Sequence, residues 1–180
     1  MRMAHGWFNN YLTGLLLALA VGCASPEKKE SRKEAATLRL YLESEFDSGD
    51  KTTLVSVVRS NPMTIRISKN PILDEAHIVQ ASVVDTMGGF AILVKYDFHG
   101  TLVLENVSNS YRGSRVAIYS MFTEGRWLAA PQVTTRITDG TLVFTPDASR
   151  EETERIVRGL NNVAGKLGNA PKTNKADQPR

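Results

Sequence analysis

One side chain in this sequence, Cys23, stands where covalent chemistry is possible. It follows an uncharged, mostly apolar run over residues 12–22, and it is the only cysteine among 180 residues. A cysteine sulfur is a nucleophile in its thiolate form, so it can accept an acyl or alkyl group. A single cysteine excludes an intrachain disulfide and a thiolate metal cluster. Cys23 is therefore a packed side chain, a reactive thiol or a point of attachment.

The residues around Cys23 favour attachment. Arg2 puts a positive charge before the apolar run, which is shorter than the roughly 20 residues of a membrane-spanning helix. The run suits a secretory signal, whose apolar region has about 7–15 residues. The sequence AVGC, which ends at Cys23, resembles the lipobox of bacterial lipoproteins, although Ala20 stands where leucine is commonest. This resemblance implies a signal over 1–22 and a diacylglycerol on Cys23.

Other fates of this segment stay open. A plain secretory signal cleaved near Ala24 would discard Cys23, and an intact short anchor would keep it. Stable anchoring needs more than one acyl chain, because each buried CH₂ contributes only about 0.8 kcal/mol. A lipidated cysteine meets this need when its new amino group is acylated too. Ala24 stands where an aspartate would be the inner-membrane cue, which predicts an outer-membrane anchor and a domain that faces the periplasm.

The other reactive side chains form no catalytic or metal-binding pattern. His77 and His99 have no cysteine or histidine neighbour at ligand spacing, and Asp85 and Asp97 flank a glycine turn that they are expected to cap. The sequence contains no serine-nucleophile motif and no phosphate-binding loop. The net charge of +3 comes from interspersed charges, unlike the basic stripe of a nucleic-acid-binding protein. We therefore predict a protein that is not an enzyme, has no cofactor or metal, and binds no nucleic acid.

Composition divides the mature chain into three parts. Residues 23–36 carry the acylated cysteine and a charged tether, 37–167 form the domain, and 168–180 form a disordered polar tail. Period-two alternation and turn residues predict strands over 37–45, 52–58, 63–69, 78–85, 90–98, 115–122, 126–132, 133–137 and 141–144.

Two hairpins are expected among these strands. Gly88 and Gly89 form the turn of the first. Its inward-facing residues are predicted to be Val79, Ala81, Val83, Phe90, Ile92, Val94, Tyr96 and Phe98. Asp139 and Gly140 form the turn of the second, which would join 133–137 to 141–144.

Two helices complete the prediction. Apolar positions at helical spacing favour a helix over 100–113, with a strand as the alternative because the segment is rich in β-branched residues. Ser149 and Glu152 form a capping box for the last helix, which ends at Gly165 or Gly168. Its apolar face comprises Thr153, Ile156, Leu160, Val163 and Ala164. A helix with one apolar face must cover a sheet, so we predict an α+β fold with an antiparallel or mixed sheet and two helices packed on one face.

Trp127 is the most prominent apolar residue outside the signal. It lies before two alanines and a proline, where it either roofs the core or presents a hydrophobic edge to a partner. The predicted partner-binding surface comprises Trp127, Val133, Arg136 and Ile137, with main-chain pairing at an exposed sheet edge as the mode of binding.

The second half of the chain resembles the periplasmic head region of SecD, the accessory subunit of protein export. The matching positions are Gly113 with 116–118, then 129–131, 137–140, and Phe144 leading into 149–160. Residues 72–101 also resemble the upstream part of that region, where a short helix precedes a hairpin and the first long helix.

The resemblance implies an α+β fold and a mobile, non-enzymatic head that contacts translocating polypeptide. The multiple membrane spans of SecD, and with them its proton path, are missing from this sequence. We therefore predict a lipid-anchored envelope protein whose head binds unfolded secretory polypeptide or an export or envelope protein, as an accessory to export. The alternative is a structural or assembly lipoprotein that forms oligomers or docks on an outer-membrane complex.

Overall fold

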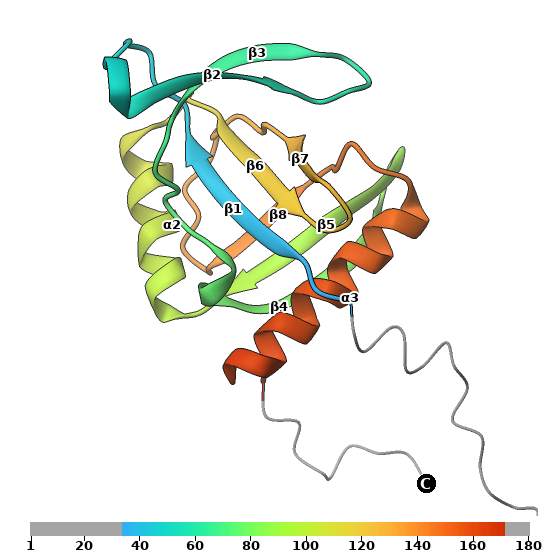
Figure 1. Cartoon of the computed structure of the whole chain (residues 1–180). Helices are drawn as coiled ribbons and strands as arrows, with labels where there is room; N and C mark the ends of the chain where they lie inside the picture. Colours follow the sequence, from blue (N-terminus) through green and yellow to red (C-terminus); the bar gives the residue numbers. More distant parts are fainter. Residues whose placement is uncertain (1–33, 172–180) are drawn as a thin grey trace, which may run out of the picture.

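The computed structural model describes residues 34–171, and Figure 1 shows the arrangement of its elements. In chain order these are β1 (Thr37–Leu42), η1 (Gly49–Lys51), β2 (Thr52–Val57), β3 (Met63–Ser68), η2 (Glu75–His77), β4 (Ile78–Thr86), β5 (Gly89–Tyr96), α2 (Phe98–Ser110), β6 (Val116–Met121), β7 (Gly125–Ala129), β8 (Thr141–Phe144) and α3 (Arg150–Leu167).

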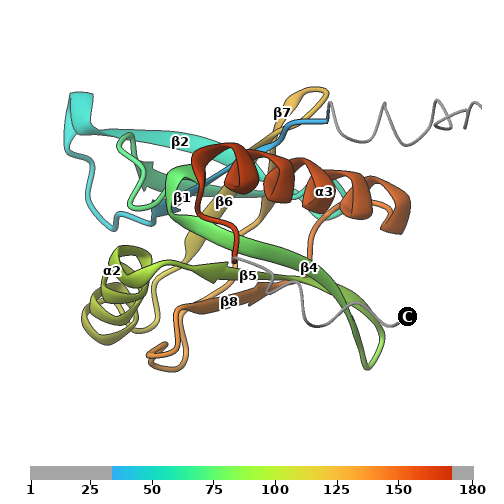
Figure 2. The same ribbon diagram turned by 90° about the horizontal axis from the view of Figure 1, so that it is seen from below.

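The strands form two three-stranded antiparallel sheets, β1–β6–β7 and β4–β5–β8, and a separate hairpin, β2–β3. Side chains from both three-stranded sheets and from both helices share one hydrophobic core. Figure 2 shows α3 lying along β4 and α2 near one end of β5. The predicted α+β fold with antiparallel strands and two helices is confirmed, but the strands are divided among three sheets instead of one.

The hairpin of β4 and β5 turns at Gly88 and Gly89, as predicted, and both residues have positive φ angles of 103° and 155°. The inward face of β4 differs from the prediction. A β-bulge between Ile78 and Gln80 shifts the alternation, so that Ile78 is buried and Val79 is only partly buried. Period two alone cannot reveal such an inserted residue.

The segment for which either a helix or a strand was predicted forms helix α2, so the alternative of a strand is wrong. The helix starts after Asp97, whose carboxylate accepts a hydrogen bond from the Gly100 N–H at 2.7 Å, and its apolar positions Leu104 and Val107 are buried. Phe98, which we predicted on the inner face of the preceding strand, is the first helical residue and is 79% exposed. The cap at Asp97 ends the strand alternation one residue too early for Phe98 to point inward.

Helix α3 follows its sequence signals closely. The Ser149 hydroxyl accepts a hydrogen bond from the Glu152 N–H at 3.2 Å, and the helix ends at Gly168 in the left-handed conformation. Of the predicted apolar face, Thr153, Ile156, Leu160 and Ala164 are buried. The Asn161 side chain binds both main-chain groups of Ala81, accepting from its N–H at 2.8 Å and donating to its carbonyl at 2.9 Å. Helix α3 thereby covers the outer edge of β4.

The second predicted hairpin is wrong. Residues 133–140 form no strand, and β8 pairs with β5 instead. The Gly140 carbonyl accepts a hydrogen bond from the Tyr96 N–H at 2.9 Å, which places β8 beside β5. The Val133 N–H donates to the Ser114 carbonyl, and the Ile137 N–H donates to the Ser108 hydroxyl. Asp139 and Gly140 therefore turn the chain into β8 without closing a two-stranded hairpin.

The described chain begins with residues packed on α3. Glu34 forms ion pairs with Arg155 at 2.9 Å and Arg158 at 3.1 Å. Burial alone would raise the pKa of the Glu34 carboxyl, but the two guanidinium groups outweigh it and lower the pKa. Ala36 is buried next to Gly159, where a Cβ would lie 2.8 Å from the Ala36 nitrogen. The sequence predicts that residues 34–36 belong to the flexible tether. Local patterns cannot show that they are packed, because the partners of Glu34 lie more than a hundred residues away in the chain.

We expect Gly159→Ala to lower the free energy of unfolding by about 1–2 kcal/mol, although alanine is the better helix former, because the new methyl group meets the main chain at Ala35 and Ala36. Gly165→Ala is the matched control in the same helix. An added Cβ there meets open space, so this change should raise stability by about 0.5–1 kcal/mol. Urea unfolding of the two full-length variants measures both effects. A change in the free energy of unfolding that has the same sign in both variants would contradict the packing argument.

No helix within residues 34–171 is long and apolar enough to span a membrane. Cys23 and the predicted signal lie outside the described residues, so lipidation stays a prediction.

Candidate functional site

The outer edge of β8 lacks a strand partner within the described chain. β8 pairs with β5 alone, whereas the opposite edge of the same sheet is covered by Asn161. Hydrogen-bonded pairs recur every second residue in an antiparallel ladder. Because Tyr96 bonds to Gly140, Leu142 and Phe144 direct their main-chain groups toward β5. The N–H and carbonyl of Val143 therefore point away from the sheet, and the residue is 49% exposed.

A cavity of about 280 Å³ lies beside this edge. Four parts of the chain line it: the second half of α2, the start of β6 at Val116, the crossing segment 131–137, and β8. The lining residues are Leu104, Val107, Ser108, Val116, Pro131, Gln132, Val133, Thr134, Thr135, Ile137, Thr141, Leu142 and Val143. None of these side chains carries a charge.

The size and lining of the cavity limit what can enter it. Sites for drug-sized molecules usually have about 300–1,000 Å³, whereas a cavity of about 150 Å³ holds one benzene ring. The space beside β8 therefore suits one or two apolar side chains better than a whole small molecule. Threonine hydroxyls and main-chain groups can bind the amides of the chain that carries those side chains. The arrangement resembles the sites at which an extended peptide adds to a sheet edge.

The crossing segment is held rigidly against α2. The Ser108 hydroxyl donates to the Glu105 carbonyl at 3.1 Å and accepts from the Ile137 N–H at 2.9 Å. Arg136 forms an ion pair with the Glu105 carboxylate, so its guanidinium group is already partnered. Val133 and Ile137 are partly buried against the main core. The site is therefore largely formed before any ligand binds.

The four residues of the predicted partner surface do not lie together. Val133 and Ile137 line the cavity, and Arg136 lies between them in the chain and outside the lining. Trp127 instead contacts Tyr41 and Tyr119 edge-on, with ring centroids 5.3 and 5.1 Å apart. Tyr41 and Trp127 pack against the small core beneath the β2–β3 hairpin, and Tyr119 lies beside Trp127.

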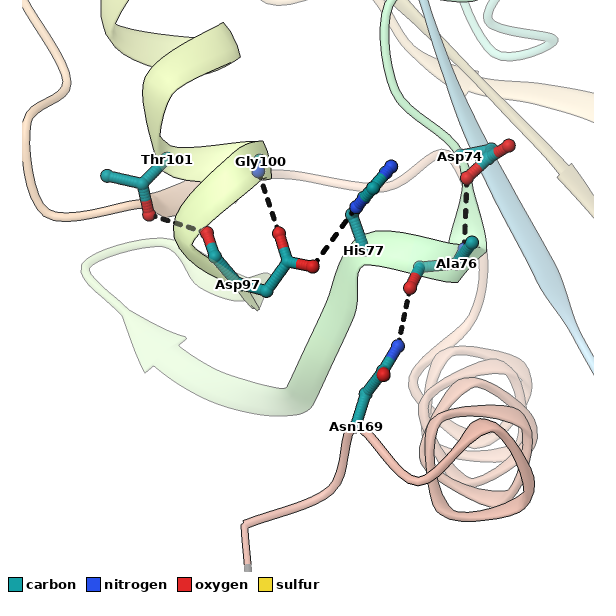
Figure 3. A network of polar contacts seen from close by, with 7 residues as sticks. All are labelled: Asp74, Ala76, His77, Asp97, Gly100, Thr101 and Asn169. Carbon is teal, nitrogen blue, oxygen red and sulfur yellow. Dashed lines mark hydrogen bonds and ion pairs between the residues drawn. The ribbon is translucent and has the colours of Figure 1, made fainter.

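The polar cluster at the start of α2 is a structural junction. The Asp97 carboxylate binds the Gly100 N–H with one oxygen and lies 3.0 Å from the His77 Nδ1 with the other (Figure 3). The Asn169 side chain donates to the Ala76 carbonyl, which ties the end of α3 to η2. Within residues 34–171, no three His, Cys, Asp or Glu side chains are placed to hold a metal ion. The cluster joins three elements of the fold.

Protonation of Asp97 should weaken this junction. Burial of the carboxyl would raise its pKa, but the Gly100 N–H and the His77 ring outweigh burial and lower the pKa below its usual value. A lowered pKa gives stability above about pH 4 that is lost as the pH falls further. We expect Asp97→Asn, which keeps a capping side chain, to cost less than about 1 kcal/mol near pH 6, because the pair is about one-third exposed. In urea unfolding the difference from the natural chain should shrink as the pH falls below about 4, and a constant difference would contradict the assignment.

These observations define an α+β domain with one covered and one uncovered edge on the same sheet. The fold is similar to two solved structures of SecDF. One, described as a membrane component that enhances protein export, matches with a TM-score of 0.53 and 20% identity over 79% of this chain and 70% of that chain. The other, SecDF in a super-membrane-facing form, matches with a TM-score of 0.54 and 19% identity over 76% of this chain but only 20% of that longer chain.

The fold expected from the resemblance to SecD is confirmed by these matches. At about 20% identity the likeness concerns the fold alone. No family model and no curated protein matches the sequence.

Proposed function

We propose that this protein is a lipid-anchored protein of the bacterial envelope whose domain binds extended, apolar polypeptide, as an accessory to protein export. The uncovered main-chain edge of β8 beside a neutral cavity carries this proposal. The likeness in fold to SecDF, which is described as enhancing protein export, supports the proposed role in export. The protein acts by binding, without catalysis.

The geometry suggests how a polypeptide would bind. An incoming strand would exchange hydrogen bonds with the Val143 N–H and carbonyl, which face away from β5. Alternate side chains of that strand point to one face, so every second residue can enter the cavity. Main-chain hydrogen bonds make such binding tolerant of sequence. The uncharged lining offers no partner to a charged side chain and so disfavours charged residues at the inserted positions.

A photoreactive amino acid at Thr135 tests this binding in the full-length, lipidated protein. Thr135 lines the cavity, and the matched position Thr138 is exposed and does not line it. With an unfolded secretory polypeptide as the probe, we expect several-fold more crosslinked product from position 135. Equal yields from the two positions would contradict the proposal. Products that contain only copies of this chain would instead favour an assembly lipoprotein.

Lipidation has its own test. Cys23→Ser should abolish labelling of the protein by radioactive palmitate and leave the precursor uncleaved, because no sulfur remains to accept diacylglycerol. The unaltered chain, labelled in parallel, is the control. Palmitate labelling that persists in the variant would refute acylation at Cys23 without bearing on polypeptide binding at β8.

A further inference from the structure

The β2–β3 hairpin has a small hydrophobic core of its own. Val57, Ile65 and Ile67 are buried against Ala117 of β6 and Ala130, which directly follows β7, separately from the main core. The hairpin lies over one end of the β1–β6–β7 sheet and takes no part in its strand order (Figure 1). We call this hairpin the arm, residues 52–68.

The two ends of the arm are attached differently. Near its base, the Ser44 N–H donates to the Arg66 carbonyl at 2.9 Å, and Arg66 pairs with Asp47 at 2.8 Å. This main-chain contact joins the arm to the end of β1. At its tip, Val57 is buried, and Val58 and Met63 pack against the small core of the arm. Two polar contacts are added there: the Asp147 carboxylate accepts from the Arg59 N–H, and the Arg59 side chain pairs with Glu124.

Asp147 is built into the body of the domain. Its own N–H donates to the Leu128 carbonyl at 2.8 Å, which fixes it between β8 and α3. Burial of its carboxyl would raise the pKa, but hydrogen bonds from Arg59 and Ser60 outweigh burial and lower it. The charged carboxylate thus holds the tip of the arm from a fixed position.

The tip also contains the single residue other than glycine with positive φ in the described chain. Val58 has φ of 63°, a region that β-branched residues rarely adopt. Such a conformation persists only where the surrounding contacts impose it. The contacts at the tip therefore work against backbone strain, and their loss would let the tip relax.

We propose that the arm is a hinged cover, held closed by Asp147, that opens about its base while the main core stays folded. Opening uncovers the rings of Tyr41 and Trp127, which pack against the small core of the closed arm and contact each other edge-on. This inference does not depend on polypeptide binding at β8.

Hydrogen exchange of the full-length protein tests the cover. Asp147→Ala should accelerate exchange of the arm amides by about tenfold, the scale of one charge-assisted hydrogen bond, and leave the β5 amides unchanged. Asp139→Ala is the matched control, because this carboxylate instead accepts from the Thr141 N–H at 3.0 Å. Unchanged arm exchange in Asp147→Ala would overturn the role of Asp147. Equal acceleration of the arm and β5 would overturn independent opening.

A second variant should act in the opposite direction. Val58→Asn relieves the strain, since asparagine tolerates positive φ, and should slow exchange of the arm amides. Trp7 lies in the predicted signal over 1–22, so Trp127 is the only tryptophan of the mature chain, and acrylamide quenching of its fluorescence reports on the covered surface. Quenching should increase in Asp147→Ala and decrease in Val58→Asn, and identical quenching in both would overturn the cover.

Discussion

Val143→Pro should weaken the binding of an extended apolar peptide by about tenfold or more while the domain stays folded. Proline removes the N–H that points away from β5 and leaves the ladder between β5 and β8 intact. Proline is tolerated on an edge strand, and Leu142 already has the extended conformation that a following proline requires. Fluorescence anisotropy of a labelled apolar peptide measures the affinity, and circular dichroism measures the fold.

Val143→Thr is the matched control for this change. Threonine keeps the N–H, the β-branch and the strand preference, so peptide affinity should stay within about twofold. A peptide N-methylated at alternate residues should bind the natural chain more weakly than the unmethylated peptide does, because it cannot donate to the Val143 carbonyl. Undiminished binding by Val143→Pro would show that the β8 edge is not the site, even if polypeptide binds elsewhere on the domain.

The position of this edge shows where sequence patterns stop being informative. A binding edge could be predicted near Val133 and Ile137, and both residues do line the cavity. The Asp139–Gly140 turn was interpreted as the tip of a hairpin because two apolar runs flank it. Whether β8 pairs with residues 133–137 or with β5 depends on contacts between residues more than 40 positions apart, such as Tyr96 with Gly140. Periodicity does not contain that information.

Local signals succeeded where the chain itself supplies the partner. Ser149 caps α3 through a residue three positions away, and Gly88 and Gly89 turn the chain between adjacent strands. The start of the packed chain could not be predicted from local signals, because the ion-pair partners of Glu34 lie on α3. Trp127 left two interpretations open, and its position beside Tyr41 and Tyr119 depends on three different strands. Motifs within a few residues were thus predictable, whereas contacts between elements were not.

The two edges of the β4–β5–β8 sheet differ in a way that supports a binding role for β8. Unpaired strand edges invite unwanted association, and proteins usually cover or interrupt them. Here Asn161 covers the β4 edge by binding the Ala81 N–H and carbonyl as another strand would. The Val143 main chain has no such partner among the described residues. Protection of one edge makes the exposure of the other a specific feature of the domain.

Asn161→Ala should therefore lower the free energy of unfolding by about 2 kcal/mol or more, since a poorly solvated donor or acceptor left unpaired costs about 1–3 kcal/mol. Both main-chain groups of Ala81 lose their partner together. Asn106→Ala makes the same substitution at an exposed position of α2 and should raise stability by about 0.5 kcal/mol through helix propensity. Urea unfolding of the full-length variants measures the difference. Similar stability of the two variants would mean that Asn161 does not protect the β4 edge. The difference between the two edges would then no longer support a binding role for β8.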